Sequence, residues 1–214
     1  MDVTGTEAAR PAPKSASKSA SKSEQTRQRI LDAAAEVLSR KGYAGTRLAD
    51  VAAVAGVQAP AIYYYFSSRD VLVEEVMWEG AHRVRLHVEE TLAALPDDST
   101  AMDRLLVAVD AHLRYELQVS DYATASIRNA GHVPEQLRVR PAAEEALYSR
   151  LWRDLFVAAQ QAGEVRADLD VNTFRLLLLG AMNWVVEWWN PRTRSLDELV
   201  ATAQGMVRHG AGTA

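Results

Sequence analysis

Residues 46–66, with the sequence TRLADVAAVAGVQAPAIYYYF, constrain the fold of this chain more than any other segment. Two short helical stretches flank Gly56, where the sequence indicates a turn, and the second stretch ends in a cluster of tyrosines. An apolar side can anchor such a unit to a domain, while its polar side fits the major groove of DNA. The segment therefore predicts a helix–turn–helix unit and makes DNA binding the leading hypothesis.

Every long segment after Glu24 shows the apolar spacing of a helix, and none shows sustained strand alternation. We therefore expect an all-α fold with about nine helices. Capping signals support four of the helix starts: Thr46, the pair Ser67 and Ser68, Asp170, and the capping box formed by Ser195 and Glu198. The helices are expected at residues 24–41, 47–54, 58–64, 69–95, 101–119, 121–130, 138–162, 171–189 and 196–209.

The amino-terminal region is basic and the remainder of the chain is acidic. Residues 10–47 contain nine Lys or Arg and three acidic side chains, whereas residues 48–214 contain 15 basic and 23 acidic ones. Basic side chains bind phosphate with release of counterions, while an acidic surface is repelled by the duplex. An ordinary solvated surface explains the same charges, so charge alone leaves both interpretations open.

Residues 1–23 are rich in Ala, Ser, Lys and Pro and contain almost no large apolar side chain. Such a segment buries too little surface to offset the entropy lost on ordering. We expect a disordered basic arm at residues 1–23. Its lysines either contact DNA or only increase solubility, and the sequence favours neither role.

Several functional classes find no support in the composition. The chain has no cysteine, which excludes zinc fingers and disulfides and suits a reducing cytoplasm. Its longest apolar run, residues 176–186, is interrupted by Asn183 and is shorter than the ~20 residues of a membrane-spanning helix. The histidines lack metal-ligand spacing, and no GxSxG or phosphate-binding glycine loop occurs. We expect a cytoplasmic protein with no membrane association, catalytic residue, metal or cofactor.

Residues 26–76 resemble the TetR family of bacterial transcription regulators. The Gly42–Tyr43 turn, Thr46, the Gly56–Val57 turn, the YYYF ending and a basic residue at position 69 all fall in the register of that family. The resemblance implies a helix–turn–helix DNA-binding domain at residues 24–68 and a ligand-binding and dimerisation domain at residues 69–214. It also implies a homodimer, formed by the last two helices, that binds a double-stranded DNA operator.

The resemblance further implies contacts with the DNA backbone. Thr46 and Arg47, at the start of the second helix, are expected at phosphates or at the groove edge. Tyr63 and Tyr64 are expected to contact the backbone through their hydroxyl groups. Arg69 takes the place of a lysine that usually contacts a phosphate. Such contacts fix the register of a protein on DNA without reading its sequence.

Base reading is expected from the start of the third helix. Gln58 resembles the main base reader, because its amide can both donate to and accept from an adenine edge. Family members often have a polar or basic residue and a glycine where this chain has Ala59 and Pro60. Apolar contacts with thymine methyl groups and DNA shape are therefore expected to carry more of the specificity. Tyr65 and Phe66 are expected in the core.

Large aromatic side chains with a few polar groups among them suit a pocket for a mainly apolar small molecule. A packed core is the alternative for each of these residues. The stretches SIRNAGHVPEQLRVR, YSRLW and GAMNWVVEWWNP are similar to the branch of the family that senses acyl-CoA thioesters, which implies an acyl-CoA effector. A hydrophobic xenobiotic that controls drug efflux is the alternative. The expected pocket residues are Tyr115, Tyr122, Arg128, Trp152, Phe156, Asn183, Trp184 and Trp188.

Residues 176–189 are apolar nearly all round, so a helix there must be buried on both sides. In a family of dimers, the outward side is the subunit interface, together with the helix that follows Ser195. A closed two-fold dimer places its reading helices about 34–36 Å apart, which predicts a palindromic operator. The expected interface residues are Leu196, Leu199, Val200 and Met206.

These observations predict a transcription regulator that responds to a ligand, most simply a repressor that an effector releases from its operator. A helical adaptor without nucleic-acid binding is the alternative. Salt separates the two, because binding to duplex DNA weakens steeply as salt rises, whereas an adaptor shows no duplex binding even at low salt.

Overall fold

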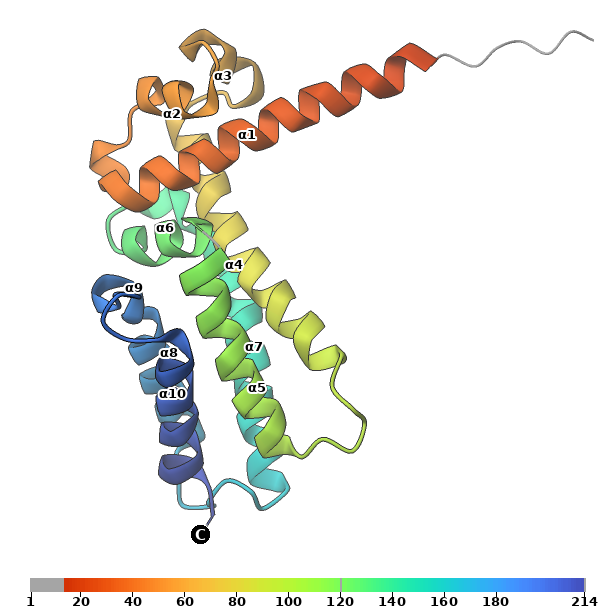
Figure 1. Ribbon diagram of the computed structural model, residues 1–214, viewed down its shortest axis with the longest axis vertical. Helices are drawn as coiled ribbons and strands as arrows, with labels where there is room; N and C mark the ends of the chain where they lie inside the picture. Colours follow the sequence, from red (N-terminus) through yellow and green to blue (C-terminus); the bar gives the residue numbers. More distant parts are fainter. Residues whose placement is uncertain (1–13, 120, 214) are drawn as a thin grey trace, which may run out of the picture.

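The computed structural model describes residues 14–119 and 121–213, and this part of the chain is almost entirely helical (Figure 1). The prediction of an all-α fold is confirmed. The only strand-like pairing among the described residues is an isolated bridge between Val165 and Gly212. The α-helices are α1 (Lys14–Gly45), α2 (Leu48–Ala55), α3 (Ala59–Tyr65), α4 (Arg69–Ala93), α5 (Ala101–Arg114), α6 (Asp121–Asn129), α7 (Val139–Gln161), α8 (Val171–Asn183), α9 (Val185–Trp188) and α10 (Leu196–Ala211).

The first helix begins at Lys14, so the prediction of a disordered arm is wrong for residues 14–23. Ala and Lys, which favour helices, recur in this stretch, and it contains no proline. Residues 1–13, the remainder of the predicted arm, lie outside the described residues. Gly42 ends the regular part of α1 as predicted, because its φ of 68° is not helical.

Two expected helices differ in detail from the structure. The α-helical part of residues 101–119 ends at Arg114 and continues as a π-helical turn, Tyr115–Val119. Residues 171–189 form two helices, α8 and α9, separated at Trp184. The predicted caps Asp170 and Ser195 are confirmed, since each side chain accepts backbone N–H groups of its own helix.

Helices α1, α2 and α3 form a small amino-terminal core together with the start of α4. Gly56, with φ of 64°, caps α2 in the left-handed conformation and turns the chain into α3. α3 is anchored through Ile62 and the chain after it through Phe66, both buried. Burial of this apolar side leaves the other side of α3 free for a partner. The fully buried members of this core include Ile30, Leu31, Leu38, Val51, Ile62 and Leu72.

The remaining helices form a second core. α5 packs against α4, α7 and α10, and α7 also contacts α8. α4 is long enough to join both cores: Val73 and Val76 belong to the first, whereas Val88 and Leu92 belong to the second. Figure 1 shows α4 running from the end that carries α2 and α3 into the helical bundle, with α6 beneath α1. No described helix is long and apolar enough to cross a membrane.

Candidate nucleic-acid interface and effector cavity

One face of α3 carries the side chains expected to contact DNA. Gln58 lies exposed at the N-cap of α3, and Pro60 is exposed in its first turn. Tyr63 and Tyr64 are 59% and 81% exposed, which is unusual for large aromatic side chains of a single chain. Ala59 is half-buried on the same helix. The structure therefore brings the predicted α3 residues to one surface.

Arg47 and Thr46 are adjacent in sequence but differ in exposure. Arg47 is exposed at the N-cap of α2 and makes no side-chain capping bond, so the prediction that Thr46 is the cap is wrong. Thr46 is 2% exposed, and its hydroxyl donates to the Gly42 carbonyl oxygen at 2.7 Å. This internal bond stabilises the turn after Gly42. The prediction that Thr46 reaches a phosphate is therefore wrong for this arrangement, whereas Arg47 is free to do so.

Arg69 holds the start of α4 against the turn before α2. Its guanidinium donates to the carbonyl oxygens of Tyr43 at 3.3 Å and Thr46 at 3.4 Å. It also pairs with Asp70 and lies 4.2 Å from the centre of the Tyr43 ring. These contacts use the side chain inside the protein. The side chain is still 31% exposed, so the phosphate contact of Arg69 stays a prediction beside this structural role.

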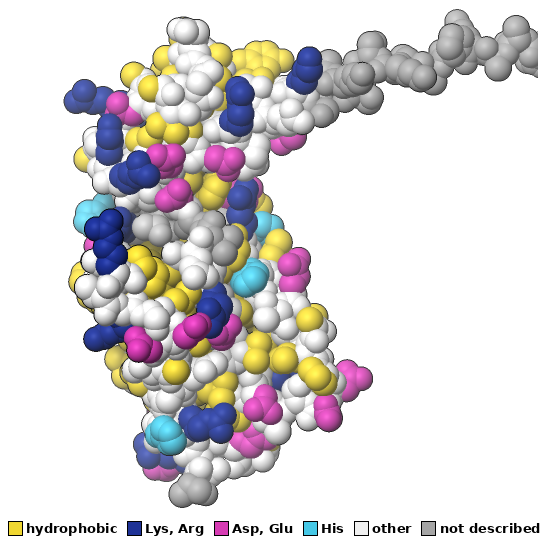
Figure 2. All heavy atoms as spheres, in the orientation of Figure 1, with side chains coloured by type: hydrophobic (Ala, Val, Ile, Leu, Met, Phe, Trp, Pro, Cys, Tyr) yellow, Lys and Arg dark blue, Asp and Glu magenta, His cyan; other side chains and the backbone are white. Residues whose placement is uncertain are grey.

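Basic side chains surround this end of the molecule. Figure 2 shows Lys and Arg side chains spaced around the end that carries α1, with Asp and Glu side chains among them. Two of the acidic groups are paired: Lys41 with Asp50 at 2.9 Å, and Arg40 with Glu36 at 2.8 Å. The electrostatic contribution to DNA binding therefore depends mainly on cations without such a partner, Arg47 among them.

A cavity of about 370 Å³ lies between α4, α5, α6, α7 and α8. This volume falls within the range of small-molecule sites. Its wall is mainly apolar, with small side chains from α4 and α6 and larger ones from α7 and α8. The lining residues are Gly80, Ala81, Val84, His112, Glu116, Ala123, Ser126, Ile127, Ala130, Glu145, Tyr148, Ser149, Leu179 and Asn183.

Asn183 is the one predicted pocket residue that lines this cavity. Trp152 and Phe156 are fully buried in the second core, where Phe156 packs against Phe174. Tyr115 packs against His87, with ring centres 4.9 Å apart. The alternative of a packed core therefore holds for Trp152 and Phe156, because hydrophobic packing and ligand binding use the same side chains.

The other predicted pocket residues face away from the cavity. Tyr122 points toward α1, and its hydroxyl donates to Asp32 at 2.6 Å. Arg128 pairs with Glu187 at 2.8 Å. Trp184 is 64% exposed and Trp188 is 48% exposed, so the prediction that they line the pocket is wrong. The sequence is apolar on every side of this helix, and it does not define which side faces the cavity.

Four polar side chains gather at the wall of the cavity. His112 Nδ1 and the Tyr148 hydroxyl are hydrogen-bonded at 2.9 Å, and His112 Nε2 lies 3.2 Å from Glu116 Oε1. Burial lowers the pKa of His112 to about 4, and the neighbouring Asn183 side chain acts in the opposite direction. Burial also raises the pKa of the Glu116 carboxyl to about 8. Both groups are therefore uncharged at neutral pH.

The sequence analysis missed His112 and Glu116. They are one helical turn apart on the inner side of α5 and its π-helical extension, in line with the buried Leu105 and Val109. Titratable residues at inner positions of an apolar stripe are a signal that could have identified them.

A second hollow of about 400 Å³ adjoins the cavity, since Ala130 and Glu145 line both. Arg138 and Val139, at the start of α7, lie at this outer hollow. A ligand with an apolar part inside and a polar part outside could use both spaces. Among the described residues, no group of three or more His, Asp or Glu side chains could hold a metal ion.

The predicted interface residues separate into two groups. Leu196, Leu199 and Val200 are buried within their own chain, because this stripe of α10 packs against α5. Their assignment to the subunit interface is wrong. Met206 is 54% exposed and remains available for a partner. The other exposed large apolar side chains in this part of the chain are Leu176, Leu177, Trp184 and Trp188.

Two family matches cover most of the chain. Residues 30–76 match "Bacterial regulatory proteins, tetR family", and residues 98–211 match "Tetracyclin repressor-like, C-terminal domain". The second match alone covers more than half of the 214 residues. The chain is a member of the TetR family. The resemblance carried by residues 26–76 is thereby confirmed, and TetR-family similarity extends almost to the end of the chain.

Relatives in the TetR family include a regulator of lipid metabolism. The fatty acid metabolism regulator protein of Bacillus subtilis (strain 168) is 25% identical over 180 residues, which are 83% of this chain and 90% of that protein. The structure of FadR from Bacillus subtilis in complex with stearoyl-CoA has a TM-score of 0.72 at 22% identity, and the match covers 86% of this chain and 98% of FadR.

A further solved structure is that of AibR in complex with isovaleryl coenzyme A and operator DNA. It has a TM-score of 0.74 at 21% identity, and the match covers 85% of this chain and 96% of AibR. At these identities, the two structures show that the TetR fold is shared.

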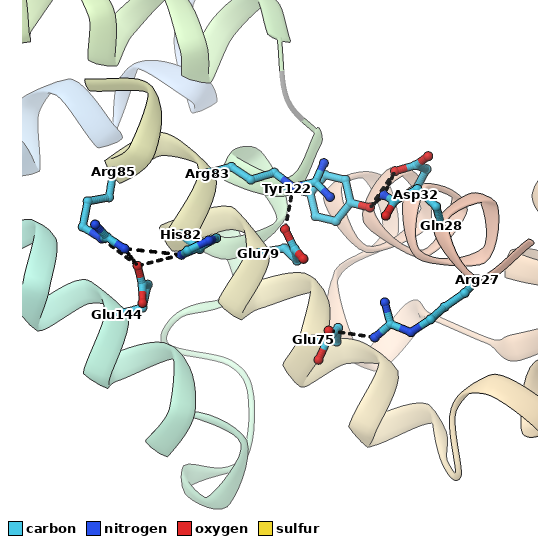
Figure 3. Close-up of polar contacts among 10 residues, drawn as sticks. All are labelled: Arg27, Gln28, Asp32, Glu75, Glu79, His82, Arg83, Arg85, Tyr122 and Glu144. Carbon is cyan, nitrogen blue, oxygen red and sulfur yellow. Dashed lines mark hydrogen bonds and ion pairs between the residues drawn. The ribbon is translucent and has the colours of Figure 1, made fainter. Parts of the chain in front are cut away.

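In this TetR-family chain, α6 lies between the cavity and the helix–turn–helix domain. Ala123, Ser126 and Ile127 line the cavity, whereas Tyr122 and Asn129 contact α1. Figure 3 shows Tyr122 directed at Asp32 and Gln28 of α1. A displacement of α6 by a ligand would therefore act directly on α1.

Polar contacts also connect α4 with its neighbours. Figure 3 shows Arg27 of α1 paired with Glu75 of α4, and Glu144 of α7 close to both His82 and Arg85 of α4. The two Arg–Glu distances are 2.8 Å and 2.7 Å. The side chains on both sides of α4 are thus charged and partly buried, which favours one defined position of the helix.

Proposed function

We propose that this protein is a homodimeric repressor, located in the cytoplasm, that binds a palindromic DNA operator and is released by a mainly apolar small molecule. The observation that carries the proposal is the placement of α6, which contributes to the wall of the cavity and to the contacts with α1. A ligand in the cavity can therefore change the position of α1, and DNA binding can in turn change the cavity. An effector releases DNA only to the extent that it binds the DNA-free arrangement of the dimer more tightly than the DNA-bound one.

The DNA side of the proposal is supported by α3. Gln58, Tyr63 and Tyr64 are exposed on a helix that Ile62 anchors from the opposite side. Gln58 would read one base edge, while the tyrosine hydroxyls and Arg47 would contact phosphates. Ala59 and Pro60 offer only apolar contacts, so thymine methyl groups and DNA shape would supply further specificity.

The dimer is supported by exposed apolar side chains of α8 and α10. Leu176, Leu177 and Trp184 follow a helical spacing on the outer side of α8, and Met206 lies exposed on α10. A group of exposed large apolar side chains is typical of a protein interface. A two-fold axis between two such faces would set the separation of the two α3 helices.

An acyl-CoA thioester is the effector class that the two hollows support best. The inner cavity would take the acyl chain, and the outer hollow beside Arg138 would take the polar part. Two similar structures, those of AibR and FadR, are complexes with acyl thioesters of coenzyme A. A hydrophobic xenobiotic is the second candidate, because the inner cavity alone could hold one.

A binding assay with genomic DNA tests the proposal. The full chain is incubated with a library of genomic fragments at low salt, and retained fragments are sequenced and titrated with increasing salt. We expect a palindromic sequence whose affinity falls steeply with salt. Stearoyl-CoA and isovaleryl-CoA are then added to the complex. Failure to retain any fragment would favour the adaptor and overturn the DNA-binding proposal, whereas retention without release by either thioester would overturn only the effector class.

A further inference from the structure

Buried polar atoms without a hydrogen-bond partner are concentrated at one wall of the cavity. Among the described residues they are His112 Nε2, Glu116 Oε2, Trp152 Nε1, Arg175 Nε and Asn183 Oδ1. Three of these atoms belong to residues that line the cavity, and the Trp152 ring packs against His112 at 5.9 Å. Each such atom costs free energy unless it finds a partner. Their grouping indicates a place built to receive a polar group.

Helical geometry holds these atoms in place. His112 is 1% exposed and Glu116 is 4% exposed, and the two side chains are one turn apart. His112 Nδ1 is hydrogen-bonded to the Tyr148 hydroxyl, whereas Nε2 lies 3.2 Å from Glu116 Oε1 without forming a hydrogen bond to it. Asn183 reaches the same wall from α8. Elements from three parts of the chain therefore converge on one position.

The chemistry of the wall selects the kind of group. Asn183 Oδ1 is an acceptor and needs a donor, whereas His112 and Glu116 can donate or accept. Glu116 and Glu145 line the inner cavity, but no Lys or Arg side chain does. A carboxylate on the ligand would therefore be buried without a cation, which is costly. A ketone could accept but could not satisfy Asn183, whereas a hydroxyl group both donates and accepts.

We propose that this wall binds a hydroxyl group on an otherwise apolar effector. The inference rests on the proposed effector role of the cavity and narrows the ligand to hydroxylated acyl chains or hydroxylated ring systems. A water molecule could occupy the position in the free protein, and the ligand hydroxyl would replace its hydrogen bonds. A saturated hydrocarbon of the same shape would displace that water without replacing its bonds.

The test compares 2-naphthol with naphthalene, which differ by one hydroxyl group. An apolar cavity of about 150 Å³ admits a benzene ring, so a cavity of 370 Å³ has room for two fused rings. Binding to the full chain is measured by calorimetry at pH 7. We expect 2-naphthol to bind about tenfold more tightly, the effect of one satisfied hydrogen bond. Equal affinities, or no binding of 2-naphthol, would overturn the proposal.

Two variants test which wall of the cavity causes the preference for 2-naphthol over naphthalene. Asn183→Leu keeps a similar side-chain size and removes the acceptor, so the ratio of the two affinities should fall toward one. Leu179→Val, on the apolar wall, should weaken both ligands together and leave the ratio unchanged. Circular dichroism of each variant confirms the fold, and the wild-type ratio tests the proposal even if a variant is unstable. A ratio that Asn183→Leu leaves unchanged would overturn the assignment to this wall.

Operator binding is measured in parallel without any ligand. If the naphthol preference is present but no genomic fragment is retained, the hydroxyl site stands and the proposed function fails. If fragments are retained and the two ligands bind equally, the proposed function stands and the hydroxyl site fails. The two outcomes are thereby distinguished.

Discussion

The side-chain oxygen of Asn129, in α6, accepts a hydrogen bond from the backbone N–H of Tyr43 at 2.7 Å. The amide nitrogen of Asn129 donates to the carbonyl oxygens of Ala125 at 2.8 Å and Leu38 at 3.4 Å. One buried side chain thus joins the helix beside the cavity to the turn that precedes the helix–turn–helix unit. Tyr43 immediately follows Gly42, whose backbone is not helical.

Removal of Asn129 should loosen this connection. We expect Asn129→Ala to lower the free energy of unfolding by about 1–3 kcal/mol, because it leaves buried backbone groups without partners. Asn129→Asp retains the acceptor for Tyr43 and should keep more of the operator affinity than the alanine variant. Urea denaturation and operator titration measure the two effects. Wild-type stability of the alanine variant would contradict the role of Asn129.

Gly80 permits α4 and α6 to approach closely. A Cβ atom at Gly80 would lie 2.5 Å from the Tyr122 carbonyl oxygen and 2.9 Å from Ser126 Cβ. Gly80→Ala should therefore force the helices apart and destabilise the protein by about 1–3 kcal/mol. Gly131→Ala is the control, because a Cβ at Gly131 meets nothing within 4 Å. Thermal denaturation of both variants measures this loss of stability. Equal melting temperatures for the two variants would count against the close approach of α4 and α6.

Gln58 and Arg47 should affect DNA binding in different ways. Gln58→Ala should relax preference at one base pair per half-site by about 1–3 kcal/mol. Arg47→Ala should weaken binding to all sequences and reduce the salt slope by about one for each lost phosphate contact. Titrations across operator variants at several salt concentrations measure both. If Gln58→Ala discriminates between operators as well as the wild type does, Gln58 is not the base reader.

Stability should depend on pH through Glu116. Its pKa is about 8 in the folded chain against an ordinary value of 4.5, so folding favours the protonated carboxyl. This contribution is complete below pH 4.5 and is lost as pH rises through 8. Between pH 7 and pH 8 we expect a loss of about 1 kcal/mol in the free energy of unfolding. His112 acts in the opposite direction, but its contribution changes little above its ordinary value of 6.5.

The variant Glu116→Gln cannot lose a proton and should remove this decrease. The control is Glu90→Gln, at an exposed position of α4, which should behave as the wild type. Urea denaturation at fixed protein concentration, at pH 7 and pH 8, measures the difference. A Glu116→Gln variant that still loses stability over this interval would show that another group is responsible.

The exposed side of α8 should carry the dimer. Leu177 is 70% exposed, and Leu177→Arg would place a charge in an apolar interface between two subunits. We expect this variant to sediment as a monomer and to bind the operator more weakly. Val54→Arg, which is exposed on α2, should remain dimeric. A dimeric Leu177→Arg variant would place the interface elsewhere.

Local signals in the sequence predicted the amino-terminal domain well. Gly42 and Gly56 mark turns because their backbone angles suit glycine, and Asp170 and Ser195 mark helix starts because their side chains accept backbone N–H groups. The exposed positions of Gln58, Tyr63 and Tyr64 follow from the apolar spacing of so short a helix. These features depend on residues close together in the chain.

The sequence by itself thus determined the all-α fold, the turns and the exposed face of α3. Only the tertiary structure decided that Trp152 lies in the core, that Trp184 faces outward, and that Leu199 packs within its own chain. It also decided that His112, Glu116 and Asn183 share one cavity wall. The reason is that a helix apolar on all sides has no preferred direction of its own, so the packing of neighbouring helices determines which side chains surround a cavity.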